Sequence, residues 1–375
     1  MRIIQVLNSP NWSAASAYCV NVSAELIKLG HDVLLMTEPG NPMKQALRLG
    51  IPCDGKLNLN SENLFEQIKC MKHFKQVFKH YQPDVVSAHM NKGSWMPAFV
   101  AKKSCQKAVV VRVRADIRAP NKHLGNIYIN HYWNDHIVCS SELHKEVCHK
   151  NLWLSNDRMS VVYGCVDADK FNPEASDGCF RKEIGATDDD FLVCLLGRLS
   201  PVKGHEYAVK AIATLKDLPK KVKLLCVGYE CERNLAWLKG EAERKGVSDR
   251  VIFVGRREDL PSILASVDVG IITSIGSEAN SRATLEYMAS GKPVISTRVG
   301  VIPELIVEGE TGFITEIRDT DTMADRIKYL ALNPDVCKRM GIASRKRIEE
   351  NFTFEKFGIQ MEKVYKKLVE KRSAS

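Results

Sequence analysis

The sequence predicts an α/β protein built from two doubly wound domains, each a parallel sheet with helices on both faces. Three observations favour this fold class. The chain has 375 residues, enough for roughly two domains of ordinary size. Hydrophobic residues make up 45% and charged residues 26% of it, a globular balance that excludes disorder, collagen and coiled coil. Short apolar runs also alternate with amphipathic stretches of helical period.

The first half of the chain follows this alternation from its start. A strand is expected at residues 3–7, a helix at 15–29 that ends at Gly30, and a strand from His31, which together form one βαβ unit. A helix is expected at 61–81, with one apolar stripe made of Leu64, Ile68, Met71, Phe74, Val77 and Phe78. Three further strands are expected at residues 84–89, 108–113 and 136–140.

A break in this pattern divides the chain. Residues 164–190 are rich in Gly, Pro, Asp and Asn and lack a period, so we expect one domain at 1–168 and a second at 169–352. Strands of the second domain are expected at residues 191–196, 223–227, 251–254, 267–272, 293–296 and 313–315. Helices are expected between them, for instance at 206–215, 233–245 and 282–290, and a final amphipathic helix at 353–369.

The net charge of +9 is unevenly distributed. Residues 1–170 carry +7 of it and nine of the ten histidines, so an anionic glycan or a phospholipid surface is an expected partner of the first domain. A solvated basic surface explains the charge as well. Nucleic acid is not expected, because no stacking or groove-reading motif accompanies the charge.

Two basic groups lie in this first domain. The helix at 61–81 carries Lys69, Lys72, Lys75 and Lys79 beside its apolar stripe, as a membrane-surface helix does, although packing of the stripe on the sheet explains the pattern too. A cluster near one strand end is formed by Arg112, Arg114 and Arg118, and either structural ion pairs or an acidic acceptor explains it.

The cysteines and apolar runs indicate a cytoplasmic protein. None of the twelve cysteines forms a Cys-x-x-Cys pair and many lie in apolar segments, so we expect buried reduced thiols. The chain opens on a strand, which leaves no room for a signal peptide, and no apolar run approaches the ~20 residues of a membrane span. The expected location is cytoplasmic, with peripheral contact to the inner membrane face as the alternative. The histidines lack metal-ligand spacing, so no metal site is expected.

The strongest local signal is the segment 273–295. An apolar strand runs into a loop of small residues that opens a helix, where backbone N–H groups attract a phosphate. Glu278 and Glu286 are eight positions apart, about two helical turns, and share a face if the helix begins near the first. Because carboxylates repel phosphate, they suit sugar or ribose hydroxyls instead. A capped helix, with Glu278 favouring its dipole and Glu286 as a solvated charge, is the structural alternative.

A second signal follows the strand at 191–196. Gly197, Arg198, Lys203 and Gly204 form a cationic loop suited to a diphosphate, with the arginine as a planar fork and the lysine as a point charge. Loops commonly carry such residues, so this signal alone is weak. Two open α/β sheets each bind ligands at the carboxyl ends of their strands, so a cleft between two such domains accommodates one ligand on both.

Together these segments resemble family 4 of the retaining nucleotide-sugar glycosyltransferases, whose GT-B fold has two Rossmann-like domains that face each other across a cleft. The resemblance covers nearly the whole chain. Its motifs are Leu29-Gly-His-Asp-Val, Pro83-Asp-Val-Val-Ser-Ala-His89, Val166-Asp-Ala-Asp-Lys-Phe-Asn-Pro, Gly197-Arg198 with Lys203-Gly204, the Glu278 and Glu286 pair, and Gly309-Glu-Thr-Gly-Phe.

The resemblance implies roles for individual residues of the second domain. Gly197, Arg198 and Lys203 would contact the donor diphosphate, and Glu286 the ribose. Glu278 would hold the transferred sugar, with backbone contacts from Ala279, Asn280 and Ser281, while Arg256 and Leu260 would lie at the base. The donor would be a nucleoside diphosphate sugar, with UDP favoured over GDP. No metal is implied, because cations and a helix dipole neutralise the leaving group.

For the first domain the resemblance implies an acceptor site, in which we place Trp12, Ser13, His89, Arg114 and Arg118. The last helix, 353–375, would return to pack on this domain. The acceptor would be an anionic glycan or a lipid-linked sugar, as in lipopolysaccharide or surface polysaccharide synthesis. The sugar would be transferred with retained configuration, without a clearly placed carboxylate nucleophile.

The sequence departs from the family in two places. The first loop reads Ser9-Pro-Asn-Trp12-Ser13 where relatives have a glycine pair, so donor contacts from this loop are not expected. Ala115 stands where many relatives have a catalytic histidine, followed here by Asp116. This is a natural difference, an engineered substitution or a one-residue displacement of the alignment.

Ala115 leaves two functions open. Either an active enzyme uses the neighbours Arg114, Asp116 or Arg118 in place of the histidine, or the chain is a catalytically impaired protein that binds sugar nucleotides. A dehydrogenase is disfavoured, because neither domain opens with Gly-x-Gly-x-x-Gly after its first strand.

Overall fold

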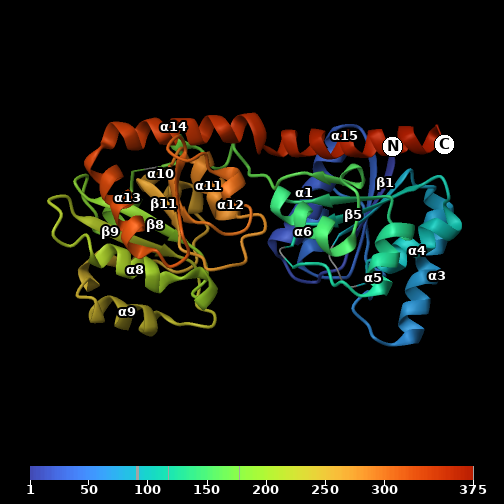
Figure 1. Ribbon diagram of the computed structural model, residues 1–375, viewed down its shortest axis with the longest axis horizontal. Helices are drawn as coiled ribbons and strands as arrows, with labels where there is room; N and C mark the ends of the chain where they lie inside the picture. The colour runs from blue at the N-terminus through green and yellow to red at the C-terminus, as the bar shows by residue number, and fades with distance from the viewer. Residues whose placement is uncertain (90–92, 117, 177, 375) are drawn as a thin grey trace. The chain divides into compact units, whose positions relative to one another are not determined.

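The computed structural model describes residues 1–89, 93–116, 118–176 and 178–374. The chain forms two compact units, which are named here unit 1 (Met1–Cys165 with Phe354–Ser375) and unit 2 (Val166–Thr353). Each unit contains one sheet of parallel strands joined by helical crossovers (Figure 1). The predicted fold class, two α/β units with parallel sheets, is therefore confirmed.

Unit 1 has a seven-stranded sheet with the order β3-β2-β1-β4-β5-β6-β7. Its strands are β1 (Arg2–Leu7), β2 (Asp32–Thr37), β3 (Cys53–Asp54), β4 (Val85–His89), β5 (Val109–Arg114), β6 (His136–Cys139) and β7 (Met159–Val161). Its helices are α1 (Ala14–Lys28), α2 (Asn41–Arg48), α3 (Leu64–Tyr81), α4 (Trp95–Ser104), α5 (Leu124–Tyr128), α6 (Glu142–Leu152) and α15 (Phe354–Ser373).

Both faces of this sheet are buried. Along β1, Ile3 packs into a core with α1 and α15, whereas its neighbour Ile4 points into a second core with α3 and α4. The strand β5 alternates in the same way, with Val109 in the first core and Val110 in the second. Burial on two faces explains why these strands read as continuous apolar runs.

Helix α15 packs on α1 and reaches the sheet. A Cβ atom added at Gly358 would lie 2.6 Å from Glu25 Cβ, so the two helices meet closely there. The buried Tyr365 hydroxyl donates to Ser87 Oγ over 2.9 Å, and Glu362 lies 2.8 Å from the ring of His31. Residues more than 270 positions apart are thereby joined inside unit 1.

Unit 2 has a six-stranded sheet with the order β10-β9-β8-β11-β12-β13. Its strands are β8 (Phe191–Leu196), β9 (Val222–Val227), β10 (Val251–Phe253), β11 (Val269–Ile272), β12 (Val294–Thr297) and β13 (Gly312–Thr315). Its helices are α7 (Phe180–Glu183), α8 (His205–Ala213), α9 (Leu235–Arg244), α10 (Leu260–Ser266), α11 (Arg282–Ala289), α12 (Ile302–Leu305), α13 (Thr320–Leu332) and α14 (Pro334–Asn351).

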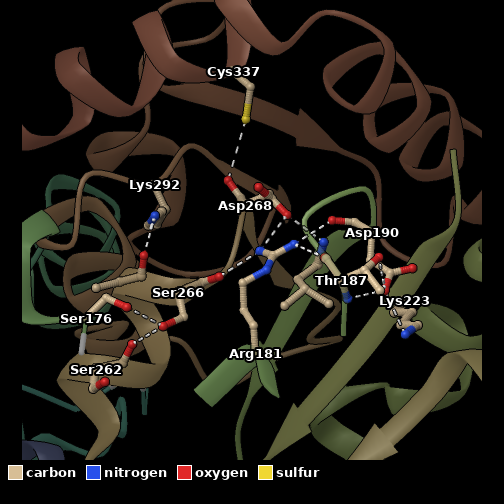
Figure 2. Close-up of polar contacts among 12 residues, drawn as sticks. Ser176, Arg181, Thr187, Asp190, Lys223, Ser262, Ser266, Asp268, Lys292 and Cys337 are labelled. Atoms are coloured by element: carbon tan, nitrogen blue, oxygen red, sulfur yellow. Dashed lines mark hydrogen bonds and ion pairs between the residues drawn. The ribbon is translucent and has the colours of Figure 1, made fainter. Parts of the chain in front are cut away.

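Polar contacts hold the amino ends of the central strands of unit 2 (Figure 2). The Arg181 guanidinium donates to the carbonyls of Ser266 and Asp190 over 2.9 and 2.6 Å. Asp268 accepts from the backbone N–H of Leu192 over 2.7 Å, and Lys223 pairs with Asp190 at 2.8 Å. At the amino edge of the sheet these side chains form structural bonds. A ligand site is therefore expected at the opposite edge, where the strands have their carboxyl ends.

The apolar stripe predicted on the helix at 61–81 is only partly buried. Phe74 and Phe78 lie in the core, but Leu64, the first residue of α3, is 66% exposed and Ile68 is 37% exposed. Phe65, which the stripe did not include, is 81% exposed. The first turns of α3 therefore present apolar side chains to solvent.

Candidate active site

Two loops of unit 2 leave the sheet at the point where its strand order reverses. From β8 the chain continues outward to β9 and β10, and from β11 it continues in the other direction to β12 and β13. In open α/β sheets, ligands bind beside the carboxyl ends of the two strands at such a point. Here these ends carry the loop 197–204 after β8 and the loop 273–281 after β11.

Glycines allow the first loop to pack closely on its neighbours. Gly204 has φ +66°, and a Cβ atom there would lie 2.2 Å from the Thr273 carbonyl oxygen, so only glycine fits at this position. The Thr273 hydroxyl donates to the Lys203 carbonyl over 2.8 Å. The aliphatic chain of Lys203 passes over Gly197, while Arg198 is exposed. The loop is therefore fixed to the end of β11, with its arginine presented to solvent.

An ion pair joins the two loops. Lys203 Nζ lies 2.6 Å from Glu278 Oε1, and the Ser274 hydroxyl donates to the same oxygen over 2.7 Å. The Glu278 side chain is only 4% exposed, compared with 24% for Lys203. A buried carboxylate is costly without such partners, so the pair fixes both side chains at the switch point.

The second loop has an unusual backbone. Ser277 and Ser281 have φ values of +65° and +35°, in the left-handed region that non-glycine residues rarely adopt. Such residues cost about 1–3 kcal/mol each and cluster at functional sites. Gly300, with φ +55°, lies in the segment after β12. It lets this segment approach the loop 273–281, since a Cβ atom at Gly300 would lie 2.1 Å from the Glu278 carbonyl oxygen.

Helix α11 begins at Arg282, the residue at which the sequence predicts its start. Ser281 is its N-cap, but its side chain accepts no bond from a backbone N–H of the first turn, and its hydroxyl lies 2.9 Å from the Thr284 hydroxyl instead. Glu278 lies before the helix, so the two glutamates do not share a helical face. The expectation of a shared face depended on an earlier start, which the left-handed Ser281 prevents.

Glu286 lies on α11 and is also buried. Arg282 Nη2 donates to its carboxylate over 3.0 Å, from one turn earlier on the same helix. Burial raises the pKa of Glu286, and the nearby Arg282 charge partly opposes that shift. Glu286 is therefore a buried carboxylate with an exposed arginine partner rather than a solvated charge.

The remaining residues assigned to the donor occupy the same edge of the sheet. Arg256 is exposed and follows β10 after Gly255, while the half-buried Leu260 is the first residue of α10. Asn280 and Ser281 are buried in the second loop, and Ala279 is half-buried beside them.

Sequence reasoning missed two residues of this edge. Ser274 donates to Glu278, and one serine among the small residues of the loop 273–281 gave no signal for that contact. His205 is fully buried at the start of α8, where neither ring nitrogen has a hydrogen-bond partner among the described residues. Burial, aided by the charges of Lys203 and Arg233, lowers the pKa of His205 to about 4.

In unit 1 the residues assigned to the acceptor differ widely in exposure. Trp12 is 40% exposed in the loop after β1, and Ser13 caps α1 by accepting from the Ser16 N–H. His89, at the end of β4, is 3% exposed, and its Nε2 lies 2.7 Å from Gln5 Oε1. Burial lowers the pKa of His89 to about 3, so the ring is neutral and bound inside the unit rather than presented to solvent.

The end of β5 carries the departure from the family pattern. Ala115 is 6% exposed and packs in the core shared with α1 and α15, so its methyl group offers no polar atom. Arg114, which is 3% exposed, lies 3.7 Å from the carboxylate of the half-buried Asp116 and donates to the Arg118 carbonyl over 2.7 Å. Arg118 itself is exposed.

Over the described residues, the structure has no helix with the length and apolar character needed to cross a membrane.

Comparison with known proteins assigns the family. The model described as Glycosyltransferase Family 4 matches residues 15–170, and the model described as Glycosyl transferases group 1 matches residues 179–347. N-acetyl-alpha-D-glucosaminyl L-malate synthase of Bacillus anthracis is 31% identical over 186 residues, which are 49% of this chain. The chain spans only 48% of the length of that relative.

Two further similarities extend over more of the chain. UDP-Gal:alpha-D-GlcNAc-diphosphoundecaprenol alpha-1,3-galactosyltransferase of Escherichia coli is 24% identical over 277 residues, 71% of this chain and 70% of that protein. The crystal structure of Anabaena HepE in complex with UDP is 20% identical, with a TM-score of 0.85 over 98% of this chain and 100% of that one. Since glycosyltransferase models match both halves and the fold is shared throughout, the chain belongs to the family 4 glycosyltransferases of GT-B fold.

Proposed function

We propose that this glycosyltransferase moves a sugar from a nucleoside diphosphate sugar, with UDP rather than GDP as the carrier, to a glycan or lipid-linked acceptor. The structural neighbour from Anabaena is a complex with UDP, which supports the donor. The relative from Escherichia coli has a name that specifies UDP-galactose and a diphosphoundecaprenol-linked acceptor, which supports the acceptor class. We place the reaction in lipopolysaccharide or surface polysaccharide synthesis.

The observation that carries this proposal is the bond of 2.6 Å between Lys203 and Glu278. It joins the residue assigned to the diphosphate and the residue assigned to the transferred sugar, at the switch point of the sheet. When the donor binds, Lys203 turns from Glu278 to the diphosphate, and Glu278 accepts bonds from sugar hydroxyls. The ion pair thus keeps both groups oriented before the substrate arrives.

The other contacts follow from position along the same edge. Arg198 and the N-terminal turn of α11 neutralise the diphosphate together with Lys203, while Gly197 lets its backbone approach. Glu286 holds the ribose, and Arg256 and Leu260 receive the base. The backbone of Ala279, Asn280 and Ser281 contacts the sugar.

The chemistry is transfer with retained configuration. The bond between the anomeric carbon and the β-phosphate oxygen breaks, and a bond from that carbon to the acceptor oxygen forms on the same face. The acceptor proton passes to the leaving phosphate, which guides the acceptor there. Leaving-group stabilisation by fixed cations supplies most of the rate, and it does so without a divalent ion in this account.

Unit 1 supplies the acceptor contacts. Trp12 and Ser13 lie in the loop after β1, and Asp116 and Arg118 follow β5. His89 is buried at the end of β4 as the neutral partner of Gln5, and it supports the acceptor site from inside the unit. We place the enzyme in the cytoplasm and at the inner membrane face, where the exposed Leu64 and Phe65 meet lipid and the lysines of α3 meet anionic headgroups.

A donor screen tests the proposed reaction. Purified chain is incubated with UDP- and GDP-linked sugars and a lipid-diphosphate sugar acceptor, in the presence and absence of EDTA. The expected result is a product from one UDP-sugar, with its donor anomeric configuration retained in the proton NMR coupling and its rate unchanged by EDTA. Inversion of the anomeric configuration would refute the retaining mechanism. Preference for GDP-sugars would refute UDP as the carrier, and inhibition by EDTA would refute independence of a divalent ion.

A second function is favoured by Ala115, whose buried methyl group cannot replace a catalytic histidine. In that case the chain binds sugar nucleotides with impaired turnover. Donor hydrolysis by the Ala115→His variant separates the two functions. A gain of a hundredfold or more, on the scale of about 10²–10⁴ for a placed acid or base, indicates impairment of the present chain. Robust turnover that the substitution leaves unchanged indicates an active enzyme.

A further inference from the structure

Unit 1 contains a cavity of about 490 Å³ beside the carboxyl end of β5. Three arginines line it, Arg112 and Arg114 from β5 and Arg118 from the segment that follows. His123, the N-cap of α5, and Asn126 line the opposite part. Of the described residues around this cavity, none is an aspartate or a glutamate.

Two of these arginines are buried deeply. Arg112 is 5% exposed and Arg114 is 3% exposed, and burial of a guanidinium is costly unless negative charge compensates it. Asp116 lies 3.7 Å from Arg114, but it is not among the residues that line the cavity. Burial and the neighbouring Arg114 charge lower the pKa of Arg112 to about 9, a cost that a bound anion would reduce.

The donors of the cavity are held in fixed orientations. Arg114 Nη2 donates to the Arg118 carbonyl over 2.7 Å, and its Nε donates to His144 Nε2 over 3.5 Å. His123 Nδ1 accepts from the backbone N–H of Asn126 over 3.0 Å. Because Nδ1 accepts this bond, Nε2 is the ring nitrogen that serves as a further donor.

We infer that this cavity binds a phosphoryl group of the acceptor, held by the guanidinium groups of Arg112, Arg114 and Arg118. A phosphate monoester has three terminal oxygens in a tetrahedral arrangement and thus needs donors from several directions. Here the donors come from β5, from the segment that follows it and from the start of α5. A planar carboxylate needs only the two parallel N–H groups of one guanidinium. The cavity also exceeds a phosphate in size, and Trp95 in its wall offers an apolar face for an attached sugar.

The identification of this phosphate as part of the acceptor rests on the proposed function. The phosphate itself can belong to a phosphorylated sugar or to a lipid-linked diphosphate, since both present the same oxygens.

Calorimetric titration of the full chain tests the inference. The protein is first saturated with UDP, so that the loops of unit 2 are occupied, and is then titrated with glucose 6-phosphate, geranyl diphosphate or acetate. The expected result is binding of at least one phosphate compound and at least tenfold weaker binding of acetate. The preferred phosphate compound identifies its source.

Variants locate the binding. Arg118→Gln removes an exposed lining charge with little risk to folding, and Lys122→Gln removes an exposed charge nearby that does not line the cavity. The first should weaken phosphate binding about tenfold or more, and the second less than twofold. Arg112→Lys, which keeps the charge but not the fork, should also weaken it. Equal effects of Arg118→Gln and Lys122→Gln, or acetate binding as tight as phosphate, would overturn the inference.

A failure of the proposed function gives a different result. If UDP does not bind, the donor assignment is wrong, and the titration is repeated without UDP in wild type and in Lys203→Met. Phosphate binding that depends on Arg118 and not on Lys203 then still supports the cavity, whereas dependence on Lys203 alone contradicts it.

Discussion

Glu278 illustrates how much of the account depends on single side chains. Its carboxylate accepts from both Lys203 and Ser274 while it is nearly excluded from solvent. We assign Glu278 to the transferred sugar and not to the nucleotide, so UDP binding and turnover should respond differently when its charge is removed.

The Glu278→Gln variant tests this separation. The amide keeps the size of the side chain but accepts weaker bonds from sugar hydroxyls, and it no longer competes for Lys203. The expected affinity for UDP stays within about threefold of wild type, and kcat/KM for the UDP-sugar falls about tenfold or more. Calorimetry and steady-state kinetics measure the two quantities. Glu243→Gln, at an exposed position on α9, is the control with the same chemical change. Equal losses of UDP affinity and turnover in Glu278→Gln would contradict the assignment.

At this scale the sequence predicted which residues meet, but not always how. Lys203 and Glu278 were assigned to one donor site by the resemblance to the family, and they form a direct bond. The burial of His89 was not foreseen, because its partner Gln5 is brought by sheet pairing from 84 positions away. The pattern of residues along one strand does not show which side chains on a neighbouring strand will lie beside it.

Among the helices, α11 and α14 show how glycine permits close packing. A Cβ atom at Gly341, inside α14, would lie 2.1 Å from the Gly291 carbonyl oxygen just after α11. That oxygen belongs to the backbone and cannot move freely. Gly240 inside α9 has open space around it, although it lies in a helix of the same unit.

These two glycines provide a matched pair of substitutions. Alanine is the better helix former by about 0.8–1.0 kcal/mol, so Gly240→Ala should raise the free energy of unfolding by up to that amount. Gly341→Ala gains the same propensity but must displace α14 from α11, so it should lower the free energy of unfolding by about 1–3 kcal/mol. Urea unfolding followed by circular dichroism measures both. Stabilisation by Gly341→Ala would show that the close contact has been overstated.

Elements with strong apolar patterns were predicted best. The strand at 191–196 matches β8 at both ends, because its apolar residues are buried between two helical layers. The helix expected from residue 61 begins at Leu64, where the Asn63 side chain caps it by accepting from the Phe65 N–H. The helix expected at 282–290 begins at Arg282, so its start was predicted correctly, whereas the shared face of Glu278 and Glu286 needed an earlier start and was wrong. The two-residue β3 is too short to form a pattern.

Acid sensitivity is a property of the molecule as a whole. Burial lowers the pKa of His89 to about 3, and burial with nearby cations lowers those of His136 and His205 to about 4. The unfolded chain binds protons on these residues below pH ~6.5, but the folded chain does not until pH ~4. The stability that they contribute is therefore present at neutral pH and is lost as the pH falls through this window.

The predicted result is a lower urea midpoint at pH 5.0 than at pH 7.5, with each buried histidine accounting for about 2 kcal/mol. His205→Leu should reduce the pH dependence of unit 2, because neither ring nitrogen has a hydrogen bond among the described residues to lose. Unfolding curves of wild type and variant at both pH values provide the measurement. An identical loss in both proteins would mean that His205 titrates normally in the folded state.

The parallel sheet with helices on both faces in each unit was predictable from the sequence, because alternating strands and helices allow few topologies. The arginine-lined cavity of unit 1 was not, although its three arginines were recognised as a cluster. Its remaining lining depends on where α5 lies beside β5, and that placement comes from tertiary packing.

The central claim is that Lys203 helps to hold the diphosphate of a UDP-sugar, and calorimetric titration with UDP tests it most directly. Lys203→Met is compared with Lys210→Met, which removes the same charge from an exposed position on α8. We predict that the first substitution weakens UDP binding about 10- to 100-fold, as expected for loss of a charge-assisted bond, and that the second changes it less than twofold. Equal affinity of both variants, or no binding of UDP to wild type, would contradict the account.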